Sequence, residues 1–237
     1  MIDKTEILEN AKVWFAESIA KNHISNTEKL IDPAEFNINP FTAVYLANFL
    51  TGNSSAESIA KALLFPRVLG TSITTTFGMG IQKFTNDVLG AFGSTTSGID
   101  IEFIDQTDKQ RKYCQLKSGP NTINKDDVAS IAGHFSGVIN LGRTNNLRIT
   151  HSDMVVGVIY GEPEELSGFY RSITSKHHYP VVIGKDFWTR LTGDQTFYHD
   201  LVASIGSIAI DADYSREFEE IISKLAETNE IKGLASE

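Results

Sequence analysis

The 237-residue sequence contains a single cysteine, Cys114. A disulfide within the chain and a cysteine-rich zinc site are therefore both excluded. No apolar run approaches the roughly 20 residues that a membrane-spanning helix needs. The N-terminal segment MIDKTEILENAKVWF carries acidic residues where a signal peptide would be basic and then apolar. We therefore expect a cytoplasmic protein with no membrane partner.

Basic residues are also in deficit. The chain has 21 lysines and arginines against 30 aspartates and glutamates, a net charge of −9. Proteins that bind nucleic acids usually show a basic surplus, so the composition argues mildly against such a partner. Binding depends, however, on the local field at the contact surface, and a protein that gathers acids around a metal ion can still present a basic cleft. The net charge alone therefore does not exclude a protein that binds nucleic acids.

The first 92 residues are mainly helical in pattern. Apolar residues recur at helical spacing over residues 4–22, and we expect further helices at 41–50, 56–64 and 81–92. The helix at 41–50 is expected to be buried and to end at Gly52. Ser54 and Ser55 are candidates to cap the next helix, which we expect Pro66 to stop. The Ser-, Thr- and Gly-rich segment VLGTSITTTFGMG predicts an exposed loop or a short strand.

The pattern changes to strands after residue 97. GIDIEFID (98–105) alternates apolar and acidic residues, a short polar turn follows, and YCQLK (113–117) completes a predicted hairpin. A helix is expected over 126–139, where Asp126 and Asp127 suit the helix dipole. MVVGVIYG (154–161) predicts a fully buried strand and PVVIG (180–184) another, with helices near 185–191, 195–206 and 214–227. With no repeats or linker, we expect one domain over 1–237, with a mainly helical part at 1–75, a core at 76–185 and a helical part at 186–237.

Four polar side chains on the predicted hairpin suggest a chemical site. Asp100 and Glu102 alternate along the first strand, and Gln115 and Lys117 alternate along the second. Side chains that face each other across a hairpin lie about 5 Å apart, so a suitable register would bring carboxylate, amide oxygen and ammonium together. Mg²⁺ prefers oxygen ligands and lowers the pKa of a bound water. The group therefore suits hydrolysis of a phosphodiester, with the lysine holding or deprotonating the attacking water.

Asp100 followed by Gln115-Leu116-Lys117, on a hairpin that precedes a helix, resembles the PD-(D/E)XK nuclease superfamily. The longer string GIDIEFID…KYCQLKSGPNTINKDDV, with FPRVLGTSITTTFG upstream, resembles type II restriction endonucleases, and among them the group that cuts interrupted palindromes of the GGNCC kind. The resemblance covers roughly residues 40–160. It implies an α/β fold with a central mixed sheet flanked by helices, and helical additions at both ends. It also implies Mg²⁺-dependent cleavage of double-stranded DNA at a short palindrome. A homodimer would follow, because two-fold DNA symmetry invites two-fold protein symmetry.

The resemblance assigns roles to individual residues. Asp100, Glu102, Gln115 and Lys117 become catalytic candidates, and Asp100, Gln115 and Leu116 become candidate metal ligands. The usual second acid of the motif is Gln115 here, which removes a charge worth a few kcal/mol beside a cation. Two outcomes are open: Glu102 supplies the missing charge, or Mg²⁺ binds weakly and a DNA phosphate completes its shell. The loops around the motif are expected to approach DNA through Ser118, Asn121, Thr122, Asn124, Lys125, Thr74, Thr75 and Arg143.

Simpler interpretations stand beside these. Asp100 and Glu102 also fit a solvated strand face, and the Gly, Pro and Asn of SGPNTIN are turn formers for backbone reasons alone. His134, on the helix after the motif, is expected to be structural, and Cys114 to be a small core residue. Alternative functions are a repair or structure-specific nuclease of the same fold, and a non-catalytic DNA-binding relative.

Overall fold

The computed structural model describes residues 4–211 and 214–235. The chain forms two compact units. The first, the sheet unit, comprises Met1–Trp14 and Gly80–Ser207, and the second, the helical unit, comprises Phe15–Met79 and Ile208–Glu237. The prediction of a single domain stays a prediction, because two compact units can still belong to one cooperative domain. Among the described residues, no helix combines the length and apolar character of a membrane span.

The sheet unit is built on four strands in the order β1-β2-β3-β4. β1 pairs antiparallel with β2, whereas β2, β3 and β4 run parallel to one another. The expected mixed sheet flanked by helices is therefore confirmed. The strands are β1 (Ile101–Ile104), β2 (Arg111–Lys117), β3 (Met154–Val158) and β4 (Val181–Ile183). The helices are α1 (Lys4–Trp14), α6 (Ile81–Asp87), α7 (Lys125–Thr144), α8 (Gly168–His177), α9 (Gly184–Thr192) and most of α10 (Phe197–Asp211), with 3-10 turns at Gly90–Phe92, His151–Asp153 and Pro163–Glu165.

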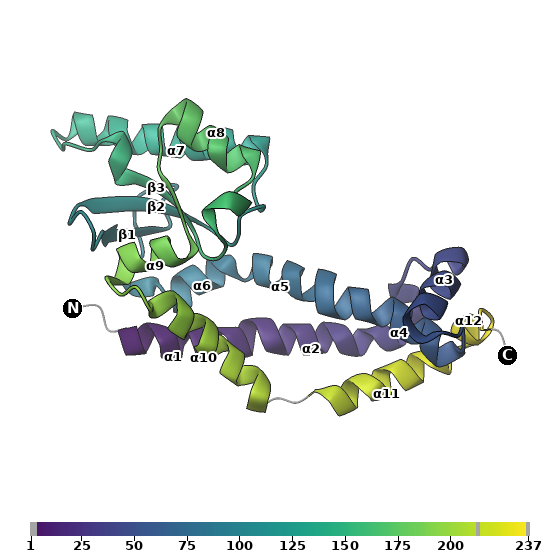
Figure 1. Ribbon diagram of the computed structural model, residues 1–237. Coiled ribbons are helices and arrows are strands. Elements are labelled where there is room, and N and C mark those ends of the chain that lie inside the picture. Colours follow the sequence, from purple (N-terminus) through teal and green to yellow (C-terminus); the bar gives the residue numbers. More distant parts are fainter. Residues whose placement is uncertain (1–3, 212–213, 236–237) are drawn as a thin grey trace. The chain divides into compact units, whose positions relative to one another are not determined.

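Helices cover both faces of this sheet (Figure 1). α7 and α8 pack on one face in a core that includes Phe135, Val156 and Tyr170. On the other face, Phe187 of α9 contacts Phe103 of β1. Because neighbouring residues of a strand point to opposite faces, odd-numbered residues of β2 face α7 and even-numbered ones face α9. This alternation places Gln115 and Lys117 on the α7 side.

Cys114 lies on the α9 side and is fully buried. Burial raises the pKa of its thiol, since the thiolate would lose its hydration there. The full burial of Cys114 agrees with the expectation that it is a core residue and not a nucleophile.

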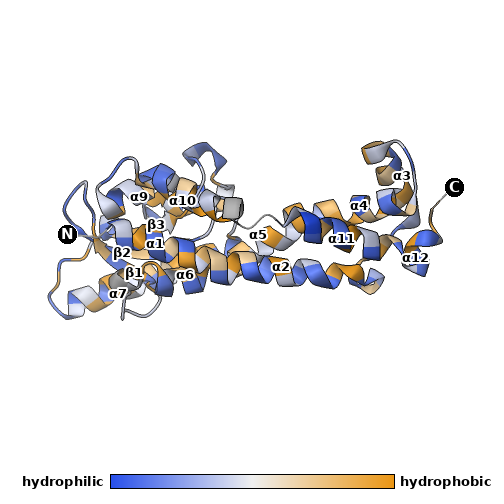
Figure 2. Ribbon diagram, turned by 90° about the horizontal axis from the view of Figure 1, so that it is seen from below, coloured by the Kyte–Doolittle hydropathy of each residue, from blue (hydrophilic) through white to orange (hydrophobic). Residues whose placement is uncertain are grey.

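The helical unit has its own apolar core, formed by α3, α4, α11 and α12. Its elements are η1 (Phe15–Ala20), α2 (Lys21–Glu28), η2 (Lys29–Ile31), η3 (Pro33–Glu35), α3 (Pro40–Thr51), α4 (Ala56–Pro66), η4 (Arg67–Ser72), α5 (Ile73–Met79), α11 (Ser215–Ala226) and α12 (Asn229–Lys232). α11 alternates hydrophobic and hydrophilic residues along its length (Figure 2), and its buried residues are Ile221, Ile222, Leu225 and Ala226.

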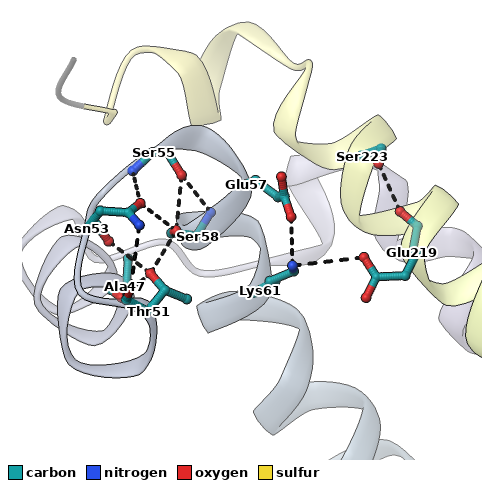
Figure 3. A network of polar contacts seen from close by, with 9 residues as sticks. All are labelled: Ala47, Thr51, Asn53, Ser55, Glu57, Ser58, Lys61, Glu219 and Ser223. Carbon is teal, nitrogen blue, oxygen red and sulfur yellow. Dashed lines mark hydrogen bonds and ion pairs between the residues drawn. The ribbon is translucent and has the colours of Figure 1, made fainter.

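Polar contacts join α3, α4 and α11 (Figure 3). Ser55 caps α4 as expected, accepting a hydrogen bond from the peptide N–H of Ser58. The Ser58 hydroxyl also contacts Thr51 at 2.7 Å and donates to Asn53 at 2.7 Å. Lys61 pairs with Glu57 at 2.6 Å and lies 3.9 Å from Glu219 of α11. The hydrogen bond to Glu57 is the main reason why the pKa of Lys61 is raised.

Two predictions for the helical unit are wrong. α3 ends at Gly52 as expected, but it buries only its small residues Ala43 and Ala47, while Phe41, Tyr45 and Phe49 are 86%, 65% and 76% exposed. Residues 67–79 form no loop or strand but the π-helical turn η4 and helix α5. The wide π turn directly follows Pro66, which has no peptide N–H to continue the α-helical ladder, and α5 then buries Thr76.

Candidate active site

Asp100 is fixed at the start of the hairpin by two contacts with β2. Its peptide N–H donates to the Cys114 carbonyl at 3.0 Å. Its Oδ2 accepts the peptide N–H of Leu116 at 2.7 Å. Ile101 pairs with Cys114, so Asp100 falls opposite Gln115. The register that the chemical hypothesis required is therefore present, and both side chains lie on the α7 side of the sheet.

Asp100, Gln115 and Lys117 line one open pocket of about 240 Å³. The remaining wall comes from the segment before β1 and from the first turns of α7. These lining residues are Gly98, Ile99, Asp127, Ser130, Ile131 and His134. The structure thus gathers three of the four predicted catalytic side chains at one place.

The amide of Gln115 is held from two sides. Its Nε2 donates to the carbonyl oxygen of Gly98 and lies 2.8 Å from Nδ1 of His134. A carbonyl oxygen can only accept, so the atom that faces Gly98 must be the nitrogen. The amide oxygen is consequently the end of the group that stays available to a cation.

Lys117 is half-buried, and within the described part of the chain its ammonium forms no ion pair. An amine in this position can turn to a ligand in the pocket without first breaking a salt bridge. Within residues 4–211 and 214–235, the carbonyl of the preceding Leu116 accepts no backbone hydrogen bond from the segment before β1. The peptide N–H of the neighbouring Ile99 donates to the Thr96 carbonyl at 3.1 Å.

Glu102 does not reach this pocket. Its carboxylate accepts hydrogen bonds from Ser94 at 2.7 Å and Thr96 at 3.1 Å, and pairs with Arg111 at 3.1 Å. With Arg111 it lines a separate, open cleft of about 1030 Å³. Of the two outcomes left open for the missing charge, the one that relies on Glu102 has no support in this geometry. Glu102 shares a strand face with Asp100, but it lies two residues further along the strand and contacts other partners.

Asp127 is a carboxylate of this pocket that the sequence interpretation treated only as a helix-dipole residue. It lies in the first turn of α7, and its Oδ2 accepts the peptide N–H of Asn124 at 2.9 Å. Ser130, Ile131 and His134 follow it at spacings of three, four and seven residues, which is one helix face. That spacing, and the apolar face of the helix, are visible in the sequence, but the sequence does not indicate which strand residues the first turn of α7 lies over.

The family described as Type II restriction endonuclease EcoO109I matches residues 48–213 of the chain. The match spans the hairpin, the pocket and α7, and it covers more than half of the sequence. The chain belongs to this family. It is accordingly a site-specific deoxyribonuclease. A search of curated proteins found no match.

The loop between β2 and α7 of the enzyme is held by its own side chains. Thr122 donates to the Gly119 carbonyl at 2.8 Å and lies 3.1 Å from the Tyr170 hydroxyl, which also donates to Gly119 at 2.9 Å. Burial raises the pKa of Tyr170 to about 12. Asn124 accepts the peptide N–H groups of Asp126 and Asp127 as the N-cap of α7. The turn-forming interpretation of this loop is therefore correct for Thr122 and Asn124.

The other predicted DNA-binding residues fall into two groups. Ser118 is buried, whereas Asn121, Lys125 and Arg143 are exposed on the sheet unit. Thr74 and Thr75 are exposed on α5 of the helical unit.

The donor set of the pocket suits a hard cation. It offers the carboxylates of Asp100 and Asp127 and an amide oxygen from Gln115, all of them oxygen atoms. No group of three or more His, Cys, Asp and Glu side chains able to hold a metal ion occurs among residues 4–211 and 214–235. The oxygen donors of the pocket fit a hard cation such as Mg²⁺, with few charges to hold it.

Proposed function

We propose that the enzyme hydrolyses double-stranded DNA at a short palindromic site of the interrupted GGNCC kind, with Mg²⁺ as cofactor and as a homodimer. One observation carries this proposal: Asp100, Gln115 and Lys117, from two strands, line the same open pocket. An anionic oxygen, a neutral oxygen and an amine converge where a phosphodiester and its attacking water must meet.

The residues that would hold Mg²⁺ are Asp100, Gln115 and Leu116, the last through its carbonyl. When bound, the ion supplies positive charge to the phosphoryl oxygen and lowers the pKa of a bound water. Asp100 is kept in place for this role by the Leu116 peptide N–H at 2.7 Å. One oxygen of the carboxylate is therefore fixed by the backbone, and the other is the one proposed to bind Mg²⁺.

Lys117 is the proposed partner of the attacking water. Its Nζ hydrogen-bonds the water and, as the neutral amine, takes up the proton that the water loses. As the ammonium it offsets the negative charge that builds up on the phosphorane. The absence of an ion pair around Lys117 within the described residues supports either role, since the amine need not leave a partner to reach the water.

The site offers little negative charge to a cation, because Gln115 stands where the motif usually has an acidic residue. Two unit charges about 4 Å apart interact by about 4 kcal/mol at an effective dielectric constant near 20, before the loss of hydration is counted. Asp127, on the pocket wall, takes the compensating role that the sequence suggested for Glu102. A phosphate of bound DNA supplies further negative oxygen ligands.

A two-fold symmetric site on DNA calls for two copies of the active site. The large exposed side chains of α3, among them Phe41, Tyr45 and Phe49, give the helical unit an apolar surface suited to contact with a second copy. Exposed Asn121, Lys125 and Arg143 on the sheet unit, and Thr74 and Thr75 on the helical unit, are the proposed contacts to DNA.

Digestion of a sequenced plasmid, followed by mapping of the fragment ends, tests the proposal. Discrete fragments are expected with Mg²⁺ and none with EDTA. Asp100→Ala and Lys117→Ala should each lower the cleavage rate by about 10²–10⁴-fold while DNA binding persists. Lys185→Ala removes an exposed lysine on α9 of the same unit and should cleave normally. A smear of random fragments, or a preference for branched over intact duplex, would overturn the assignment.

A further inference from the structure

His134 lines the pocket but has no part in the chemistry described so far. It lies on α7, and its ring packs against the backbone of Gly98 so closely that a β-carbon at Gly98 would fall 2.5 Å from His134 Cγ. The residue as a whole is nevertheless exposed. Its Nδ1 is 2.8 Å from Nε2 of Gln115.

The chemistry of this contact allows one arrangement. The Gln115 nitrogen faces the Gly98 carbonyl, so it donates one hydrogen there. An amide nitrogen cannot accept, so its second hydrogen must point to His134, and Nδ1 must be the unprotonated nitrogen of the ring. Both amide hydrogens are then used, and the amide oxygen is directed away from Gly98 and His134.

We propose that His134 is a positioning residue that fixes the amide of Gln115 with its oxygen toward the cation, an inference that rests on the Mg²⁺ site of the proposed function. A glutamate at this position needs no such partner, because its two oxygens are equivalent. A glutamine does, because rotation of the amide by 180° presents N–H groups to the cation in place of an oxygen. The histidine thus matches the departure of this chain from the acidic motif.

The experiment compares His134→Leu with His134→Asn in the full-length enzyme. Leucine fills similar space without an acceptor, whereas the asparagine oxygen can take the place of Nδ1. Mg²⁺ is titrated calorimetrically at millimolar concentration, and the Mg²⁺ dependence of plasmid cleavage is measured in parallel. We expect His134→Leu to weaken Mg²⁺ binding about three- to tenfold, as the competent amide orientation loses population, and His134→Asn to restore it. The cleavage rate at saturating Mg²⁺ should change little.

A second background separates positioning from general damage to the site. In Gln115→Glu the amide orientation no longer exists, so adding His134→Leu should change Mg²⁺ affinity less than about twofold. An equal loss in both backgrounds, or unchanged affinity in His134→Leu alone, would overturn the inference while leaving the Mg²⁺ site intact. A wild-type enzyme with neither Mg²⁺ heat nor Mg²⁺-dependent cleavage would overturn the proposed function, and this inference with it.

Discussion

Replacing Gly98 with alanine should disturb the pocket through the ring of His134. Gly98 has a φ of +77°, a left-handed conformation that costs a residue with a β-carbon about 1–2 kcal/mol. The new β-carbon would also lie 2.5, 2.7 and 2.8 Å from three atoms of the His134 ring. Because the ring is partly exposed, it can swing away, and the further cost is then its hydrogen bond to Gln115, about 1 kcal/mol. We expect Gly98→Ala to lower the free energy of unfolding by about 2–3 kcal/mol.

Urea unfolding measures this loss, and Gly52 offers a matched control. Gly52 has a φ of +79°, but a β-carbon there would meet nothing within 4 Å, so Gly52→Ala reports the backbone term alone. Because Gly98→Ala already loses the hydrogen bond of the displaced ring, adding His134→Ala to it should lower the free energy of unfolding little further. Equal destabilisation by Gly98→Ala and Gly52→Ala would refute the reasoning, since the ring would then not be packed on Gly98. Mg²⁺ affinity should fall in Gly98→Ala and stay normal in Gly52→Ala.

Three further predictions concern charge and burial. Gln115→Glu should bind Mg²⁺ more than about tenfold tighter, as measured by calorimetry. Without Mg²⁺, its free energy of unfolding in urea should be lower by about 1–3 kcal/mol, because a carboxylate oxygen would face a backbone carbonyl. Asp127→Asn keeps an acceptor for the helix cap but removes a charge from the pocket. It should weaken Mg²⁺ binding at least about threefold more than the control Asp126→Asn, which removes an exposed charge from the same helix turn. Equal effects of the two substitutions would contradict the role of Asp127. The raised pKa of Tyr170 stabilises the fold fully below pH 10, its ordinary value, and this stability is lost as pH rises through about 12. Tyr170→Phe should remove that alkaline loss in unfolding curves while costing the hydroxyl contacts with Thr122.

The hairpin could be predicted from sequence because strand alternation is local. The period of two fixes which side chains share a face, and the short turn makes pairing of the two strands the simplest arrangement. Alternation says nothing, however, about position along the strand. Two residues advance a strand by roughly 6.6 Å, so Glu102 shares the face of Asp100 and still reaches Arg111 in place of the pocket.

Errors in the helical regions have a tertiary origin. The sequence of α3 predicts an apolar helix that is buried. The helix packs instead through the face with Ala43 and Ala47, because these small side chains let neighbouring elements come close to its backbone. The large side chains of Phe41, Tyr45 and Phe49 are left exposed on the surface. In the same way, Asp127 meets the expectations for a first-turn acid and is also part of the pocket wall. A helix pattern gives the relative direction of its side chains, while the rotation of the helix against the sheet is set by the core around Ile131 and Phe135.

Because Gln115 is a neutral ligand, its contribution to the site depends on the orientation of its amide. An acidic residue would attract Mg²⁺ in any rotamer, so its surroundings could vary; an amide contributes only a dipole, which is useful in one orientation. The carbonyl of Gly98 and the ring of His134 hold that orientation by accepting the two hydrogens of the amide nitrogen. With one formal charge fewer, the pocket gains more from the negative oxygens of a bound phosphate than a fully acidic site would. Mg²⁺ affinity should therefore rise more steeply on addition of DNA in the wild-type enzyme than in Gln115→Glu, and calorimetric titrations with and without an oligonucleotide duplex compare the two directly.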